Sequence, residues 1–394
     1  MTAMARELLD GLVDPALHAD GEPHALWRWM RRNAPVHRHE PADLPPFWSL
    51  VRYEDVRAAY RDPHRFSSAR GVLLRPTRHG EDPGGGRTLA LTDPPRHRHL
   101  RALAADWFTA RAVRALEGPL REITRAVVAR VVEQGEFDFV HDVAGRLSIY
   151  TIGSIMGVPE ADHEALFRWT NEAFEAGRSL AQSPPLMGYF IDLMDRRLAE
   201  PGDDLTSSLV WGIVDGEPLT EFEILLNCEN LVGATENGRL AIAGGMLALL
   251  DRPGEWRRLE ADRDLLPGAV EEVLRWTSSA VHSMRTTTEP VTVGGRRIEG
   301  GDRVVLWVPS ANRDEEVFAD PDRFDITRAP NRHLAFGAGE HVCIGTVLAR
   351  AQIRILYSEL LDRAGRLERT GPAHPVRSLA VAGPEVLPMR VTAR

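Results

Sequence analysis

A ten-residue stretch near the C-terminus, residues 336–345, holds the side chains best suited to chemistry. It reads Phe-Gly-Ala-Gly-Glu-His-Val-Cys-Ile-Gly, so that three glycines surround Cys343. Glycine allows a positive φ and lets a flat ligand lie close to the backbone. An amphipathic helix pattern follows directly, and the positive end of a helix dipole favours the thiolate form of a nearby cysteine. A thiolate in a glycine-lined loop suits a single soft ligand to a planar iron cofactor.

Other roles for a cysteine fit this pattern less well. A lone cysteine is usually a small buried hydrophobe, which is what we expect of Cys228. A nucleophile would need histidine and asparagine companions, and no such signature stands out. Zinc would need more cysteine or histidine ligands at short spacings. The pattern therefore favours an iron ligand at Cys343.

The stretch resembles the haem-binding loop of the cytochrome P450 family, Phe-Gly-x-Gly-x-His/Arg-x-Cys-x-Gly, and matches it at every fixed position. The resemblance implies a mainly α-helical fold with a smaller β region. Haem b would lie between a long central oxygen-activation helix and the helix after Cys343, with Cys343 bound to the metal. It also implies cofactor contacts for Phe336, Gly337, His341 and Gly345.

Composition is that of an ordinary globular chain, with 394 residues, 43% apolar and 27% charged. With the resemblance, we expect one cytochrome P450 domain over 1–394. Its β-rich parts would cover about 34–52, 286–310 and the C-terminal strands, and its helical parts about 53–275 and 340–365.

Charge and hydropathy limit the location and the partners. The net charge of −9 argues against nucleic-acid binding. Two cysteines in unrelated contexts fit a reducing compartment. Neither a signal-type N-terminus nor an apolar run long enough for a bilayer is visible, so we expect a cytoplasmic monomer of the bacterial type without membrane contact.

Hydrophobic periodicity predicts the elements that position the loop. Helices are expected over 22–33, 53–61, 95–108, 110–133, 138–156, 160–175, 186–199 and 346–363. Strands are expected over 36–40, 47–51, 291–293 and 304–308. Residues 66–92 read as a long irregular loop of the binding type. A capping box at Thr220 and Glu223 opens a helix expected to run unbroken to about Leu250.

His97 and Arg101 stand four residues apart on one face of the helix expected over 95–108. Such a pair is often only a solvated basic face. Here it matches the family segment Asp-Pro-Pro-x-His-x-x-x-Arg, which implies that both side chains hold haem propionates. The same resemblance implies that Arg285 and His333 contact the propionates or their surroundings.

Residues 233–239, Gly-Ala-Thr-Glu-Asn-Gly-Arg, place two glycines and an acid inside an apolar helix, as functional sites often do. They resemble the family's oxygen-activation segment, Ala-Gly-x-(Asp/Glu)-Thr-Thr. The resemblance implies catalytic roles for Thr235, Glu236 and Asn237, with Asn237 in place of the usual threonine. Asparagine can donate a hydrogen bond and orient a water, but it is a poor proton relay. Either Asn237 holds the water that delivers protons, or a polar group of the substrate helps.

Further residues fall where relatives line the substrate pocket: Gly233, Ala234, Val281, His282 and Val381. His282 could anchor a polar group of the substrate or be a buried structural histidine. Apolar residues between 165 and 195 belong either to a lid over the pocket or to the core.

Glu272 and Arg275 have the i, i+3 spacing of a helix ion pair. Placed before the cysteine loop, they resemble the family's Glu-x-x-Arg, which supports that loop structurally. A third member would be Arg323 or Arg328.

The resemblance implies a haem-thiolate monooxygenase that inserts one atom of O2 into a small organic substrate. We expect hydroxylation or epoxidation of a bacterial secondary metabolite, namely a polyketide, peptide or terpenoid intermediate. The thiolate would favour O–O cleavage. The alternatives are oxidative coupling, a peroxide-driven reaction, and a non-catalytic haem or ligand-binding protein.

Because no flavin or nicotinamide motif is visible, electrons would come from a ferredoxin and its reductase, docking near Arg350 and Arg354. The substrate would be free or tethered to a carrier protein. Basic residues in the long loop hint at an acidic or carrier-tethered substrate: Arg75, Arg78, His79 and Arg87.

Overall fold

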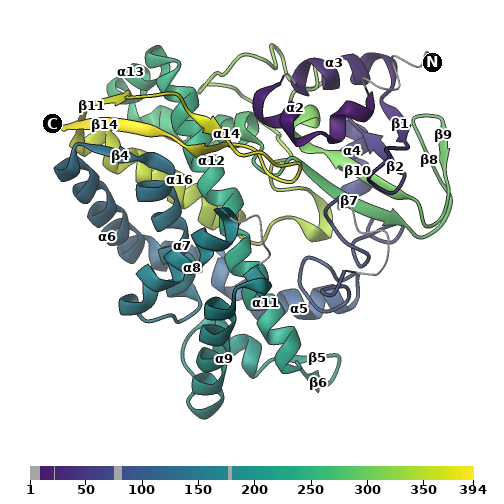
Figure 1. Cartoon of the computed structure of the whole chain (residues 1–394), viewed down its shortest axis with the longest axis horizontal. Coiled ribbons are helices and arrows are strands. Elements are labelled where there is room, and N and C mark those ends of the chain that lie inside the picture. Colours follow the sequence, from purple (N-terminus) through teal and green to yellow (C-terminus); the bar gives the residue numbers. More distant parts are fainter. Residues whose placement is uncertain (1–8, 22, 75–81, 176–179) are drawn as a thin grey trace.

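The computed structural model describes residues 9–21, 23–74, 82–175 and 180–394. Helices make up most of it, and a smaller β region lies beside the N-terminal helices (Figure 1). The first helices are α2 (Pro15–Asp20), α3 (Pro23–Asn33), α4 (Tyr53–Tyr60), α5 (Arg96–Ala105), α6 (Ala110–Gln134), α7 (Arg146–Ile155), α8 (His163–Glu175) and α9 (Pro184–Ala199). The remaining ones are α10 (Leu205–Val210), α11 (Glu221–Gly233), α12 (Thr235–Leu250), α13 (Pro253–Ala261), α14 (Leu266–Thr277), α15 (Val308–Ala311) and α16 (Thr346–Arg363).

The largest sheet has the order β1-β2-β10-β7-β3. Its strands pair antiparallel except for β2 and β10, which run parallel. These five are β1 (Val36–His39), β2 (Phe47–Leu50), β3 (Phe66–Ser67), β7 (His282–Thr287) and β10 (Arg303–Trp307). A second sheet joins β11 (Ala364–Arg369), β14 (Pro388–Ala393) and β4 (Glu136–Asp138). Two-stranded pairs are formed by β5 (Ile213–Val214) with β6 (Glu217–Pro218), β8 (Val291–Val293) with β9 (Arg296–Ile298), and β12 (His374–Pro375) with β13 (Pro384–Val386).

The predicted helices and strands are confirmed to within a few residues. The segment expected as one helix over 138–156 begins as a π-helix, Phe139–Gly145, before α7. The described part of 66–92 is irregular apart from β3, as expected. Among the described residues, each helix is too short or too polar to cross a bilayer.

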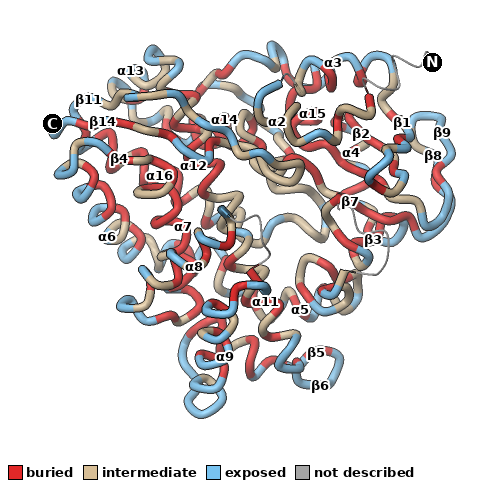
Figure 2. The backbone as a smooth tube through the Cα atoms, in the orientation of Figure 1, coloured by how far each residue is buried: buried red, intermediate tan, exposed pale blue. Residues whose placement is uncertain are grey.

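The helical core surrounds α12, which is buried along most of its length (Figure 2). It packs against α7, α14 and the π-helix Phe139–Gly145, and Tyr357 of α16 donates a hydrogen bond to its Ile242 carbonyl. Gly245 permits this close approach, because a Cβ there would lie 2.4 Å from both Tyr357 Oη on α16 and Val273 Cγ1 on α14. Apolar side chains of the lid candidates Phe167, Leu186 and Phe190 belong to this core.

The long central helix is not continuous, contrary to expectation. The capping box at Thr220 and Glu223 is present, but α11 ends at Gly233 and α12 begins at Thr235, with a turn at Ala234. The Thr235 hydroxyl donates a hydrogen bond to the Val232 carbonyl at 2.5 Å. A side-chain hydroxyl that bonds the backbone in this way competes with the helical ladder, which loosens the helix at this point.

We predict that Gly245→Ala destabilises the protein by about 1–3 kcal/mol, because the added methyl group overpacks the contact of α12 with Tyr357 and Val273. The measurement is urea unfolding followed by circular dichroism. Gly254→Ala is the matched control, since that exposed helical glycine has nothing within 4 Å of a new Cβ. The control should be stabilised by about 0.4–1 kcal/mol. Equal effects at both positions would contradict the packing account.

Candidate cofactor and active site

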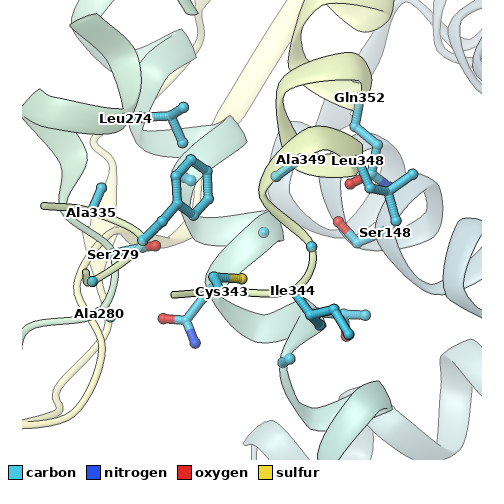
Figure 3. Close-up of a pocket in the computed structure, with 18 of the residues that line it drawn as sticks. Ser148, Leu274, Ser279, Ala280, Ala335, Cys343, Ile344, Leu348, Ala349 and Gln352 are labelled. Atoms are coloured by element: carbon cyan, nitrogen blue, oxygen red, sulfur yellow. The ribbon is translucent and has the colours of Figure 1, made fainter. Parts of the chain in front are cut away.

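A cavity of about 310 Å³ separates the beginning of α12 from the loop 336–345. Figure 3 shows the Cys343 sulfur between Ser279 and Ala280 on one side and Leu348 and Ala349 of α16 on the other. The predicted site residues that line the cavity are Ala234, Thr235, Asn237, Arg285, Phe336, Gly337, His341, Cys343 and Gly345. The fold therefore brings the cysteine loop and the atypical helix segment to one space.

The glycines of the cysteine loop have different roles. Gly337 and Gly339 have φ angles of +69° and +75°, which residues with a side chain rarely adopt. A Cβ on Gly339 would also lie 2.6 Å from the Tyr60 carbonyl oxygen. Gly345 has an ordinary φ of −79°, but its Cβ would stand 3.8 Å from the Cys343 sulfur and narrow the cavity there. The loop is closed by a hydrogen bond from the Cys343 N–H to the Phe336 carbonyl at 2.9 Å.

The exposed surface of Cys343 lines the cavity. Desolvation raises the pKa of its thiol, although the backbone N–H of Gly345 and the positive charge of Arg101 lower it. When only protein atoms surround the sulfur, desolvation therefore outweighs the contacts that favour the thiolate, contrary to the expectation from the sequence. A coordinated metal cation reverses this balance, because a coordinating thiol is deprotonated. Cys228 behaves as expected, since burial raises its pKa to about 12.

Arg285 and His341 line the cavity, whereas His97 and Arg101 of α5 do not line it and lie close to His341. The rings of His97 and His341 lie 4.0 Å apart, and both nitrogens of His97 and Nε2 of His341 are buried without a hydrogen-bond partner. Among the described residues, neither Arg101 nor Arg285 forms an ion pair with a carboxylate. Burial lowers the pKa of His341 to about 3, and the charges of His97, Arg285 and Arg101 add to this effect.

This cluster has the chemistry of an anion site. Unpartnered nitrogens next to unpaired guanidinium groups are what the two carboxylates of a haem would satisfy. Together with the cysteine facing the cavity, the residues present fit iron protoporphyrin IX.

At the opposite wall, Asn237 lines the cavity and its Oδ1 is buried without a partner. Thr235 also lines the cavity, with its hydroxyl already donated to Val232. Glu236 does not line it. Its carboxylate forms a two-pronged ion pair with Arg239, which also donates to Asn171 Oδ1 at 3.2 Å.

Four residues predicted for the substrate pocket do not line the cavity. A Cβ on Gly233 would face Leu180 at 3.7 Å, and Val281 is buried in a separate apolar cluster. His282 is a structural histidine, because its Nε2 accepts from the Leu74 N–H and its Nδ1 meets the Leu379 carbonyl. Val381 pairs with Ala280 in a β-bridge.

His333 lies outside the cavity as well. Its Nε2 lies 3.2 Å from a Glu271 carboxylate oxygen, and its Nδ1 accepts from the Ala335 N–H. Glu271 also takes two hydrogen bonds from Arg350. Arg354 is likewise paired, with Glu117. The charges of Arg350 and Arg354, which we expected to bind a ferredoxin, are therefore partly neutralised by these carboxylates.

Of the basic residues in the long loop, Arg75, Arg78 and His79 lie outside the described residues. Arg87 donates to the Pro83 carbonyl at 2.8 Å and stacks over the Phe222 ring. Arg87 thus gives no support for a basic binding loop.

The Glu272–Arg275 pair is buried completely, with both side chains 0% exposed. Arg328 is its third member, with Nε 3.2 Å from Glu272. Arg323 contributes only its carbonyl, which accepts from Arg275 and Arg328. Loop geometry decides between the two arginines.

Several lining residues carry no signal in the sequence. Ser148 and Ile152 come from α7, and Gln352 comes from α16. Tyr60 donates to Ser283 Oγ at 2.8 Å, and both line the cavity. These residues sit in ordinary amphipathic or strand patterns, so only the packing of the elements reveals them.

A mainly helical fold in which one cysteine and a cluster of basic, anion-binding side chains meet at one cavity is typical of haem-thiolate proteins. Comparison with known proteins agrees. The cytochrome P450 family model matches residues 258–364. A putative cytochrome P450 126 of Mycobacterium tuberculosis is 38% identical, with 93% of this chain and 94% of that protein covered. The cyclomarin C epoxidase CymV of Salinispora arenicola is 39% identical, with 95% and 97% covered.

Among solved structures, P450 OxyD, involved in the biosynthesis of vancomycin-type antibiotics, has a TM-score of 0.89 at 34% identity, with 97% of this chain and 99% of that chain covered. The chain belongs to the cytochrome P450 family. It is accordingly an oxidoreductase that binds haem b and uses O2 as a monooxygenase.

We predict that Arg275→Ala lowers the free energy of unfolding by about 3–5 kcal/mol, because it leaves the Glu272 carboxylate buried and without Arg275. Arg297→Ala is the control, since Arg297 and Glu299 form an exposed pair. Its loss should cost no more than about 1 kcal/mol. Urea unfolding curves of both variants provide the measurement, and similar curves would contradict a supporting role for the buried pair.

Proposed function

We propose that the Cys343 thiolate would bind the haem iron and that the enzyme hydroxylates or epoxidises a small organic molecule. The substrate class would be an intermediate of bacterial secondary metabolism. One observation carries the proposal: Cys343 lines a cavity that is also lined by Arg285 and His341 and by Thr235 and Asn237 of α12. When bound, the haem supplies an electron-rich iron centre that reduces dioxygen and oxidises carbon.

The protein's first task is to hold and orient the cofactor. His97, Arg101, Arg285 and His341 bind the propionates, which gives their buried nitrogens partners. Phe336, Gly337 and Gly345 allow a flat ring to approach Cys343. The Glu272–Arg275–Arg328 cluster supports the loop from behind and takes no part in the chemistry.

The second task is proton delivery. Asn237 donates a hydrogen bond through its amide and orients a water, while Glu236, paired with Arg239, exchanges protons with the outside. Thr235 keeps the helix open next to Ala234, where there is space for a small molecule. The apolar walls of the cavity exclude bulk water and favour an apolar or mixed substrate.

The proposed redox partners follow from the sequence, in which no flavin or nicotinamide motif is visible. Two electrons would come from a ferredoxin and its reductase, which would dock on the face next to Cys343. Arg350 and Arg354 still expose 36% and 35% of their side chains there and remain available at the rim of a contact. We expect a cytoplasmic monomer. A carrier-tethered substrate remains part of the proposal because a similar structure is P450BioI with an acyl carrier protein, at 29% identity.

A second reaction type is favoured by Asn237 alone. Without the usual hydroxyl, the enzyme would depend less on delivered protons, as in oxidative coupling or a peroxide-driven reaction. Turnover with peroxide, compared with turnover with ferredoxin and dioxygen, separates the two.

We predict that Cys343→Ser abolishes the thiolate-type band of the reduced carbon monoxide complex, because a serine hydroxyl cannot replace the thiolate. The difference spectrum is the measurement. Cys228→Ser is the control and should keep the band, since Cys228 is buried away from the cavity. Persistence of the band in Cys343→Ser would sink the assignment.

We predict that Asn237→Ala lowers product formation about tenfold and diverts electrons to hydrogen peroxide, because the side chain that orients the proton-delivering water is lost. Product and peroxide are measured with a compound selected for shifting the haem spectrum. Asn33→Ala, on an exposed helix end, is the control. Unchanged coupling in Asn237→Ala would refute a role in proton delivery.

A further inference from the structure

Three buried side-chain oxygens close to the cavity have no hydrogen-bond partner. They are Ser148 Oγ on α7, Thr170 Oγ1 on α8 and Asn237 Oδ1 on α12. Ser148 is 4% exposed and Thr170 is 0% exposed. Buried polar groups are nearly always satisfied by protein or by ordered water, so these orphans point to a bound molecule.

A second, very small cavity explains two of them. It lies between α7, α8 and α12, and its volume of about 10 Å³ is close to that of one water. Its polar lining comes from Ser148, Thr170, Asn171, Thr235 and Arg239. A water needs two to four polar partners, and this lining offers them.

Ser148 and Thr235 line both cavities. Ser148 therefore stands between the small cavity and the haem side. Gly238 keeps this boundary open, because its Cβ would already lie 3.5 Å from Ser148 Oγ and a longer side chain would fill the space. Gly238 directly follows Asn237, so the Ser148 hydroxyl meets α12 at the atypical segment.

The other end of the small cavity leads to charged groups. Arg239 lines it and binds Glu236 and Asn171. The small cavity thus brings Arg239, which pairs with Glu236, to the same space as Thr170 and Ser148, and Ser148 also lines the main cavity.

We infer that the small cavity holds one ordered water bound by Ser148 and Thr170, and that the Ser148 hydroxyl relays protons from this water into the haem pocket. The inference rests on the proposed monooxygenase function. A hydroxyl donates and accepts at the same oxygen, so Ser148 can accept a proton from the water and release its own toward the pocket. The amide of Asn237 cannot do this readily. Ser148 would supply from α7 the hydroxyl that α12 lacks at position 237.

The first test is crystallographic and independent of turnover. In the haem-loaded wild-type protein at high resolution, we expect water density within hydrogen-bond distance of Ser148 Oγ and Thr170 Oγ1. Thr170→Val keeps the shape but removes one partner and should lower the occupancy of this water. A dry cavity in the wild type would overturn the inference.

The second test measures how electrons divide between product and hydrogen peroxide, with a surrogate ferredoxin and a compound that shifts the haem spectrum. Ser148→Ala and Thr170→Val should raise the peroxide share about five- to tenfold, on the scale of a lost proton relay. Thr151→Val is the matched control, because its buried hydroxyl on α7 only binds the Leu147 carbonyl. Adding Asn237→Thr to Ser148→Ala should restore coupling, which a merely structural defect would not allow.

Equal peroxide shares in Ser148→Ala, Thr170→Val and Thr151→Val would refute the relay. The haem content and the carbon monoxide band of each preparation show whether a variant has lost its haem or its thiolate ligand instead of the proton relay. Absence of the thiolate-type band in the wild type would reject the proposed function itself, whereas the water density would still decide on the small cavity. If Ser148→Ala does not fold, Thr170→Val carries the test.

Discussion

The buried ion pair of Glu272 and Arg275 connects three parts of the chain that are far apart in sequence. Arg275 donates to the carbonyls of Asn312 and Pro321, and Glu272 receives the side chains of Arg328 and Asn331. The segment between 312 and 331 is thereby wrapped around two charges that water does not reach. Asn312 then accepts from the Leu334 N–H at 2.6 Å, directly before the cysteine loop. These contacts connect the charge pair on α14 to the backbone that leads into the cysteine loop, and an unpaired ion at this depth would be costly.

The two walls of the cavity differ in how firmly they are built. The cysteine wall is fixed by backbone hydrogen bonds and by glycines at φ angles that residues with a side chain rarely adopt. The α12 wall is loosened at Ala234, where the helix is interrupted. A firmly held cysteine loop suits the binding of one cofactor, and an interrupted helix opposite it suits the binding of different substrates. Asn237 on this wall and Ser148 on the neighbouring α7 each have an unsatisfied side-chain oxygen.

What the sequence predicts well is local. The cysteine loop, the spacing of His97 and Arg101 and the capping box at Thr220 each depend on residues close together in the chain, so their geometry follows from short-range rules. Packing decides the rest. His282 could face a substrate or the core, and the Leu74 and Leu379 backbone settles it. The choice of Arg328 over Arg323 depends on the course of an irregular segment. Ser148 is invisible as a site residue, because nothing near it in sequence distinguishes it from a core serine.

The cluster of His97, Arg101, Arg285 and His341 has a thermodynamic consequence beyond recognition. Burial lowers the pKa of all four groups, and the guanidinium charge of Arg101 lowers the pKa of both histidines further. In the folded chain, burial thus disfavours the charged forms of Arg101 and Arg285, and neither has a carboxylate partner among the described residues. In the proposed site, the two haem carboxylates would offset this cost only in the native arrangement, so cofactor capture and native-state stability would be linked by mass action. The concentration of available haem would then determine what fraction of this protein stays folded.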